Sequence, residues 1–196
     1  MEEILKLLGS QSGQQLISGA SSQLGIENNQ VQNVLAMALP ALLSGLNKNT
    51  NQPGGAEALM GAVSNHDESI LDNVMGFLGQ GNFTDGQNIL GHILGGSQSN
   101  VENAVSQSTG VSSSNVAQIM AMAAPLLLGL LNKETKQNNL DANGLSNMLT
   151  NIVGGATQSN QEGMSMIEKL IDQDGDGSVM DDVSSIGMSL FQNFMK

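Results

Sequence analysis

An internal repeat is the sequence feature that most limits how this chain can fold. Residues 24–48 and 109–133 align without a gap at a shift of 85 residues, and both segments end in Leu-Asn-Lys. The same shift places Ile4-Leu5 on Ile89-Leu90. Agreement this dense predicts two copies of one structural module, in which the interior of one copy resembles that of the other.

The spacing of apolar residues within each copy is helical. In the second copy, Val116, Ile119, Met120 and Ala123 follow the i, i+3, i+4, i+7 pattern, and no sustained alternation predicts a strand. We therefore expect an all-α fold, with the polar stretches 49–55 and 136–139 as loops. The expected helices lie near residues 2–9, 12–24, 29–47, 55–64, 68–78, 86–95, 98–109, 113–132, 140–153, 158–171 and 181–195.

Glycine and proline occupy matching positions in the two copies. Gly25 and Gly110 stand where a helix should end in a left-handed residue. The clusters Ser112-Ser113-Ser114 and Asn28-Asn29 are expected to cap the helices that follow them. Pro40 and Pro125 interrupt the most apolar helix of each copy. Each proline should kink that helix or divide it in two.

The repeat suggests a division of the chain into three parts. Residues 1–85 form the first helical repeat, residues 86–171 form the second, and residues 172–196 add an acidic loop and a C-terminal helix. The acidic loop falls where the first copy has the sequence GQGNFTDG, which lacks alternating Asp residues. Only one of the two equivalent turns is therefore expected to bind a metal ion.

The acidic loop, residues 172–183, predicts a Ca²⁺ site. Asp172, Asp174 and Asp176 alternate, so their carboxylates can converge on one cation. Gly177 follows where the chain must turn sharply, and Ser178 is placed to offer its backbone carbonyl. The pattern resembles an EF-hand loop.

The end of this loop departs from the EF-hand pattern. The twelfth position should be a bidentate Glu, and here it is Val183. Asp182 is the better substitute, with Asp181 as the alternative. Two other interpretations stay open: an acidic turn that binds nothing specifically, and a site that prefers Mg²⁺ or Mn²⁺.

Charge and composition exclude several functions. The formal net charge is −12 and the chain has no Arg, which argues against nucleic acids and against an anionic membrane surface. The chain has no Cys, so disulfides and thiol chemistry are excluded. The apolar run from Ile119 to Leu131 is short for a membrane span. A fully buried helix is expected there, with a membrane-inserting hairpin as the alternative.

Catalytic groups are scarce. His66 and His92 lie in different elements, and neither has a partner at the spacing of a metal site or an acid–base pair. We therefore expect no enzyme activity. The 12 Met residues, Met37 and Met122 among them, are expected to fill a core with few aromatic side chains. An adaptable groove for an apolar ligand or partner helix is the alternative.

The segment from Ile89 to Lys133, together with the DGDG loop and the Asp-Asp pair after it, resembles bacterial domain-of-unknown-function family 937, and loosely the YidB-like proteins. The resemblance covers nearly the whole chain. It implies an all-α fold and a bacterial source, and it implies no activity.

The sequence thus predicts an acidic helical protein that binds one Ca²⁺ through Asp172, Asp174, Asp176, Ser178 and Asp182, with a structural or interaction role. A carrier of an apolar ligand or partner helix is the alternative. A protein partner and self-association are both left open. The first residues do not resemble a cleaved signal peptide, so the compartment is undetermined and the cytoplasm is the default expectation.

Overall fold

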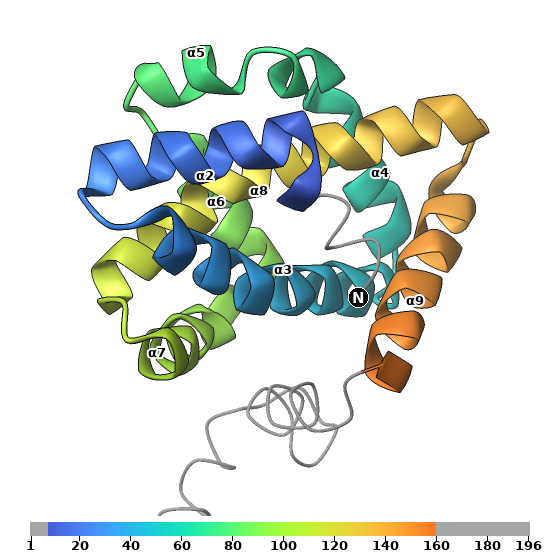
Figure 1. The fold of residues 1–196 in the computed structure, drawn as a ribbon. Coiled ribbons are helices and arrows are strands. Elements are labelled where there is room, and N and C mark those ends of the chain that lie inside the picture. The colour runs from blue at the N-terminus through green and yellow to red at the C-terminus, as the bar shows by residue number, and fades with distance from the viewer. Residues whose placement is uncertain (1–7, 160–196) are drawn as a thin grey trace, which may run out of the picture.

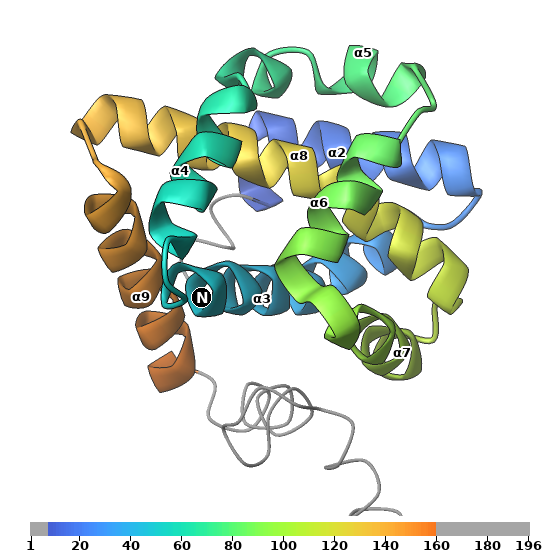
Figure 2. The same cartoon turned by 180° about the vertical axis from the view of Figure 1, so that it is seen from behind.

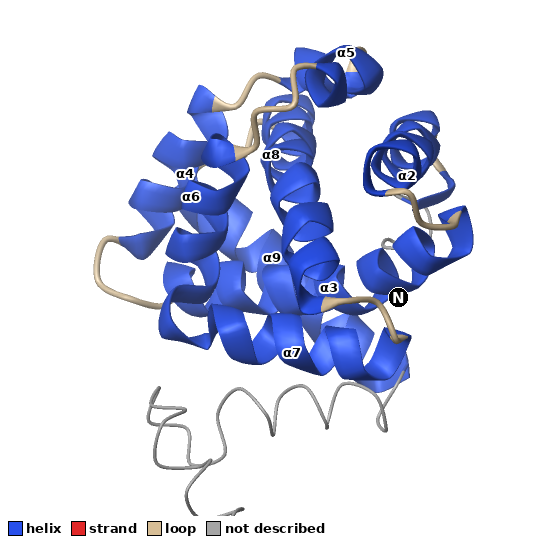
Figure 3. Cartoon of the chain, turned by 90° about the vertical axis from the view of Figure 1, so that its left-hand side faces the viewer, coloured by secondary structure: helices blue, strands red, loops and turns tan. Residues whose placement is uncertain are grey.

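The computed structural model describes residues 8–159 of the chain, and in this range the protein is built from helices without a strand (Figures 1 and 3). The predicted all-α class is confirmed for this part. The elements are α2 (Gln11–Leu24), α3 (Asn28–Thr50), α4 (Gly55–Asn65), the 3-10 turn η1 (Glu68–Leu71), α5 (Val74–Gly79), α6 (Thr84–Leu94), the 3-10 turn η2 (Gly95–Ser97), α7 (Gln98–Thr109), α8 (Ser113–Asn138) and α9 (Ala142–Ser159).

Two long apolar helices, α3 and α8, form the centre of the fold, and the shorter helices pack around them (Figure 1). Every residue of α8 from Ile119 to Gly129 is buried. Met120 and Met122 are fully buried in the core, as predicted, and Met37 is partly buried against it. Buried side chains from both halves of the sequence form one contiguous apolar cluster.

Among the described helices, α8 alone is long and apolar enough to cross a membrane by length and composition. In this fold 72% of its most apolar stretch is buried inside the protein, as in the core helix of a globular domain. Pro40 and Pro125 lie inside α3 and α8, and both helices continue past them. The proline therefore divides neither helix, which corrects one of the two outcomes expected from the sequence.

The α2–α3 and α7–α8 junctions have the same construction. Gly25 and Gly110 end the first helix of each pair in the left-handed conformation, with φ of 65° and 72°. The hydroxyl of Ser21 donates to the carbonyl of Ile26 at 2.5 Å, and that of Ser106 donates to Val111 at 2.6 Å. Both turns are therefore fixed by a glycine and by a serine four residues before it.

Three expected boundaries are wrong. Residues 68–78 form η1 and α5 instead of one helix, because the Asp67 and Asn73 carboxylate and amide oxygens accept backbone N–H groups and start each element anew. Residues 136–139 are not a loop, since α8 continues to Asn138 and ends at Asn139 in the left-handed conformation. No loop separates the two last helices expected in the second copy, because α9 runs without a break to Ser159.

Candidate ligand cavity

The predicted Ca²⁺ site falls outside the described residues. Asp172, Asp174, Asp176, Ser178 and Asp182 all lie beyond residue 159. Within residues 8–159, no group of three or more His, Asp or Glu side chains is placed to hold a metal ion. The described part of the chain therefore does not test the Ca²⁺ prediction.

A cavity of about 540 Å³ opens between α4 and α6, and residues of α3 and α8 also line it. Figure 2 shows α4 and α6 side by side on one face of the protein, with α3 running across both. The apolar wall of the cavity is made of Leu46, Ala58, Leu59, Ala62, Ile89, Ile93 and Leu128. Its polar lining is made of Asn49, Asn65, His66, Asp85, Asn88 and His92. The volume and this mixture are typical of a small-molecule site.

Close backbone contacts hold α6 in place along the cavity. A Cβ atom at Gly86 would overlap the carbonyl oxygen of Ala121, so α6 rests directly on the backbone of α8. At the other end, Asn49 Nδ2 donates to the carbonyls of His92 and Ile93 at 2.9 and 3.3 Å. The side chain from α3 thus satisfies carbonyls that the end of α6 leaves without partners.

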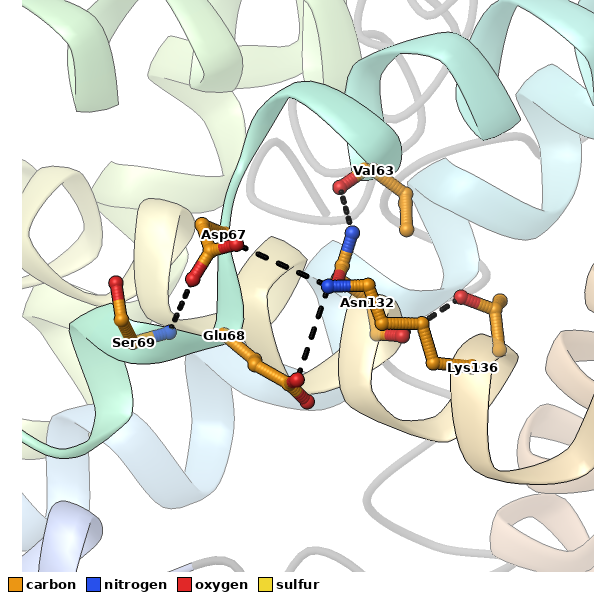
Figure 4. A network of polar contacts seen from close by, with 7 residues as sticks. Val63, Asp67, Glu68, Ser69, Asn132 and Lys136 are labelled. Atoms are coloured by element: carbon orange, nitrogen blue, oxygen red, sulfur yellow. Dashed lines mark hydrogen bonds and ion pairs between the residues drawn. The ribbon is translucent and has the colours of Figure 1, made fainter.

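Helix α4 is fixed in the same way. At its start, a Cβ atom at Gly55 would overlap the carbonyl oxygen of Asn49. Near its end, Asn132 Nδ2 of α8 donates to the Val63 carbonyl at 2.8 Å (Figure 4). Between these two contacts, α4 turns only the small side chains of Ala58 and Ala62 and one Leu toward α6. The space between the helices stays unfilled for that reason.

His66 and Asp85 meet at the cavity across the two helices. His66 ends α4, Asp85 lies in the first turn of α6, and His66 Nε2 is 3.1 Å from Asp85 Oδ2. His66 Nδ1 lies 2.8 Å from the Ala62 carbonyl oxygen. The fold thus gives His66 a carboxylate neighbour that sequence spacing did not indicate. Nothing in the spacing of two residues 19 apart indicates this contact, because it depends on how α4 and α6 are arranged.

A polar network fixes the turn after His66. Lys136 Nζ lies 3.8 Å from Asp67 Oδ2 and 3.7 Å from Glu68 Oε1 (Figure 4). The Ser69 N–H donates to Asp67 Oδ1 at 2.8 Å, and this hydrogen bond, assisted by nearby Lys136, lowers the pKa of Asp67. Asn132 thus holds the backbone just before His66 on α8, and the exposed Lys136 side chain lies near the two carboxylates that follow it.

Comparison with known protein families matches residues 6–134 to the family described as "Bacterial protein of unknown function (DUF937)". The match includes every residue of the cavity lining, from Leu46 to Leu128. Comparison with curated proteins and with solved structures found no match.

Proposed function

Since the chain belongs to the DUF937 family of bacterial proteins, whose description assigns no activity, we propose its role from the cavity. We propose that this protein is a binding protein and not an enzyme, and that the cavity between α4 and α6 takes a small, uncharged, mostly apolar molecule. The observation that carries the proposal is a 540 Å³ space with an apolar wall and a few polar groups from two helices.

The lining defines the ligand's chemistry. Seven apolar side chains offer contact area and no hydrogen bond, so most of the ligand surface must be apolar. Asn65 and Asn88 can donate to and accept from a hydroxyl, carbonyl or amide group, and Asn49, whose Nδ2 is bonded to α6, can accept through its Oδ1. No Lys is among the described residues that line the cavity, and Asp85 would repel an anion. An uncharged molecule with one polar end fits this lining best.

The His66–Asp85 contact is the feature that would favour an enzyme. An imidazole that acts as a general base donates a hydrogen bond to a carboxylate from one nitrogen and faces the reacting group with the other. Here Nδ1 lies against the Ala62 carbonyl and Nε2 against Asp85, so both nitrogens are engaged within the protein. The described cavity lining also lacks a hydroxyl, thiol or amine that could act as a nucleophile. Both observations support a binding role.

The proposal keeps the hypothesis of a carrier for an apolar ligand, but it places the ligand site between α4 and α6. The sequence suggested the Met- and Ala-rich repeated helices as the walls of a groove. Because Met120 and Met122 are fully buried in the core, α8 contributes only Leu128 to the cavity lining. The other walls come from the shorter helices α4 and α6 and from the end of α3.

A titration with the uncharged dye Nile red tests the proposal. A molecule of about 24 heavy atoms at roughly 0.3 kcal/mol per atom should bind with a Kd of about 5 µM. Ala62→Leu should fill part of the cavity and weaken binding about tenfold or more. The matched control is Ala56→Leu, the same change on the same helix at a position outside the lining. Equal binding by both variants would show that the dye binds elsewhere.

We also propose that the C-terminal loop binds one Ca²⁺ through Asp172, Asp174, Asp176, Ser178 and Asp182, as a structural element of the protein. The supporting observation is the alternating Asp pattern with Gly177 at the turn. Metal that binds only the folded state adds to folding stability, and this contribution grows with the logarithm of the free Ca²⁺ concentration above the Kd. The test is calcium titration calorimetry of the full chain, with Asp174→Asn as the variant. A full-length protein that takes up no Ca²⁺ at millimolar concentration would sink this proposal.

We infer in addition that the helical part of the chain arose by duplication of one helical module. The matched glycine and serine positions of the α2–α3 and α7–α8 junctions, 85 residues apart, support this. Because only one copy carries the alternating Asp residues, the duplication favours a single Ca²⁺ site over a pair of coupled sites.

A further inference from the structure

A surface groove of about 600 Å³ lies along α9, next to the end of α8. Its apolar centre is formed by Leu140, Met148 and Ile152, and Asn147 and Asn151 stand beside them. Met148 and Ile152 are packed against the core on one side, yet they are only partly buried. The groove is separate from the cavity between α4 and α6, because no described residue lines both.

The helix that carries this groove is the counterpart of α4 in the second copy. Asn47 of α3 and Asn132 of α8 stand at matching positions, 85 residues apart. Asn132 holds α4 by donating to the Val63 carbonyl at 2.8 Å. Asn47 holds α9, because its Oδ1 accepts from the Thr150 hydroxyl at 2.9 Å, and Figure 1 shows α9 beside the end of α3. Each long helix therefore holds the short helix of the other copy.

The groove occupies the same face of α9 that the cavity occupies on α4. A shift of 86 residues places Leu145 on Leu59, and both side chains are buried. The same shift places four groove residues on four residues of the cavity lining: Gly144 on Ala58, Met148 on Ala62, Asn151 on Asn65 and Ile152 on His66. On α4, this face lies opposite α6. The repeat therefore predicts that the counterpart of α6 lies opposite α9.

The counterpart of α6 is the beginning of the sequence. The shift of 85 residues places Leu8-Gly9 on Ile93-Leu94, the two residues that end α6. Leu8-Gly9 is helical as well, and the Leu8 side chain is buried, as Ile93 is. The same shift places Ile4 on Ile89, which lines the cavity from α6. Ile4 is therefore the residue of this segment that should face α9.

The strip of α3 that this segment would cross is only partly covered by the described residues. In the second copy, α6 rests on the backbone of Ala121, and the neighbouring Met122 is fully buried. The matching residues of α3, Ala36 and Met37, are only partly buried. The first copy thus leaves open a surface whose counterpart in the second copy is closed.

The chain after α9 is the other segment that could cover the groove. In the first copy, the chain after α4 forms η1 and α5, which pack against α8 and α2. No described residue of η1 or α5 lines the cavity. By the same repeat, the segment of residues 160–196 is directed away from the groove, and residues 1–7 are directed toward it.

We propose that residues 1–7 extend the helix that ends at Gly9 and dock on the groove of α9, with Ile4 against Met148 and Ile152. Burial of these apolar side chains drives the docking. The occupant of the groove is thus a segment of the same chain.

This docking closes an apolar surface and encloses no second ligand site. Met148 stands where α4 has the small Ala62, so a side chain fills the space that the first copy leaves open. Met1 stands where α6 has Gly86, so contact with α9, and not a close backbone contact with α3, holds the segment. The inference is independent of the proposed ligand and implies one ligand cavity per chain.

Methyl NMR of the full-length protein, with labelled Ile δ1 and Met ε groups, tests the inference. A nuclear Overhauser effect between Ile4 and Met148 or Ile152 is expected. A mixture of differently labelled chains shows whether this contact lies within one chain. The inference is overturned if Ile4 shows no such effect, if the effect arises only between two chains, or if the groove contacts Ile171 or Ile186 instead.

A double-mutant cycle measures the same contact through the melting temperature. Ile4→Ser and Met148→Ser should each lower the melting temperature by about 3–6 °C. Because both changes remove one contact, the double variant should lose less than the sum of the two losses. Lys6→Ser is the matched control, since its counterpart Gly91 is exposed, and it should change the melting temperature by less than about 2 °C.

The outcomes distinguish this docking from the proposed ligand site. If Ile4→Ser is as stable as Lys6→Ser, or if the losses of the cycle add fully, the docking is overturned and the cavity stands. If the wild-type protein binds no Nile red while Ile4 contacts α9, the proposed function fails and the docking stands.

Discussion

The contact between α6 and α8 at Gly86 gives the sharpest test of how the cavity is built. An added Cβ at Gly86 would overlap the Ala121 carbonyl oxygen and lie 2.7 Å from its carbonyl carbon and 3.1 Å from its Cα. All three atoms are backbone, so no side chain can rotate away. In Gly86→Ala, α6 must move off α8, and the wall that carries Asp85 and Ile89 moves with it.

The expected magnitude follows from two opposing effects. Gly→Ala inside a helix ordinarily stabilises by about 0.4–1 kcal/mol. Overpacking against fixed atoms costs about 1–3 kcal/mol or more, and here it exceeds the helix gain. We therefore expect Gly86→Ala to lower the free energy of unfolding by about 1–2 kcal/mol. That corresponds to a fall in melting temperature of about 2–8 °C for a chain of this size.

Gly91→Ala is the matched control, because Gly91 lies in the same helix and has no atom within 4 Å of the added Cβ. It should raise the melting temperature by about 1–4 °C. The assay is urea and thermal unfolding followed by far-ultraviolet circular dichroism. If Gly86→Ala is as stable as Gly91→Ala, α6 does not rest on the α8 backbone and the account of the cavity wall is refuted.

Three further predictions concern other contacts. Asn132→Ala should cost about 1 kcal/mol in the free energy of unfolding, because a buried side-chain hydrogen bond to the Val63 carbonyl is lost while that carbonyl keeps the His66 N–H as a donor; a variant as stable as wild type in urea would contradict this. Gly25→Ala and Gly110→Ala should each lower the free energy of unfolding by about 1 kcal/mol, because both residues have positive φ. No atom lies within 4 Å of either added Cβ, so the loss comes from the backbone alone, and unequal losses would argue against equivalent junctions. The lowered pKa of Asp67 stabilises the protein above its unfolded pKa near 4 and loses this effect as pH falls through the lower folded value. The urea midpoint of Asp67→Asn should therefore fall less than that of wild type between pH 6 and pH 3, and an equal fall would contradict this assignment.

The helices that were predicted well are those whose ends are set by local sequence. Gly25 and Gly110 end helices through their backbone angles, and Ser112, the first of the three expected serines, caps α8. The expected cap at Asn28-Asn29 is wrong, because both residues lie inside α3 and Glu27 is its N-cap. The errors arise where a tertiary contact overrides a polar composition. Residues 136–138 looked like a loop, yet they continue a helix whose preceding turn buries Thr135 against the protein.

The cavity could not be predicted from the sequence. A cavity is space that no side chain fills, and it depends on the distance between α4 and α6, which is set by backbone contacts at Gly55 and Gly86. The His66–Asp85 contact follows from the same arrangement. The Ca²⁺ loop is the opposite case, because alternating carboxylates are a local pattern that sequence alone predicts.

The most direct test of the central claim is a methyl NMR titration of the full-length protein with Nile red. The account predicts shift changes centred on Leu59, Ile89 and Ile93 of the cavity wall, with little change at Leu16 and Ile17 of α2, which line no part of this cavity. Shift changes that avoid the cavity wall, or no changes at dye concentrations well above 5 µM, would contradict the claim that this cavity binds a small apolar ligand.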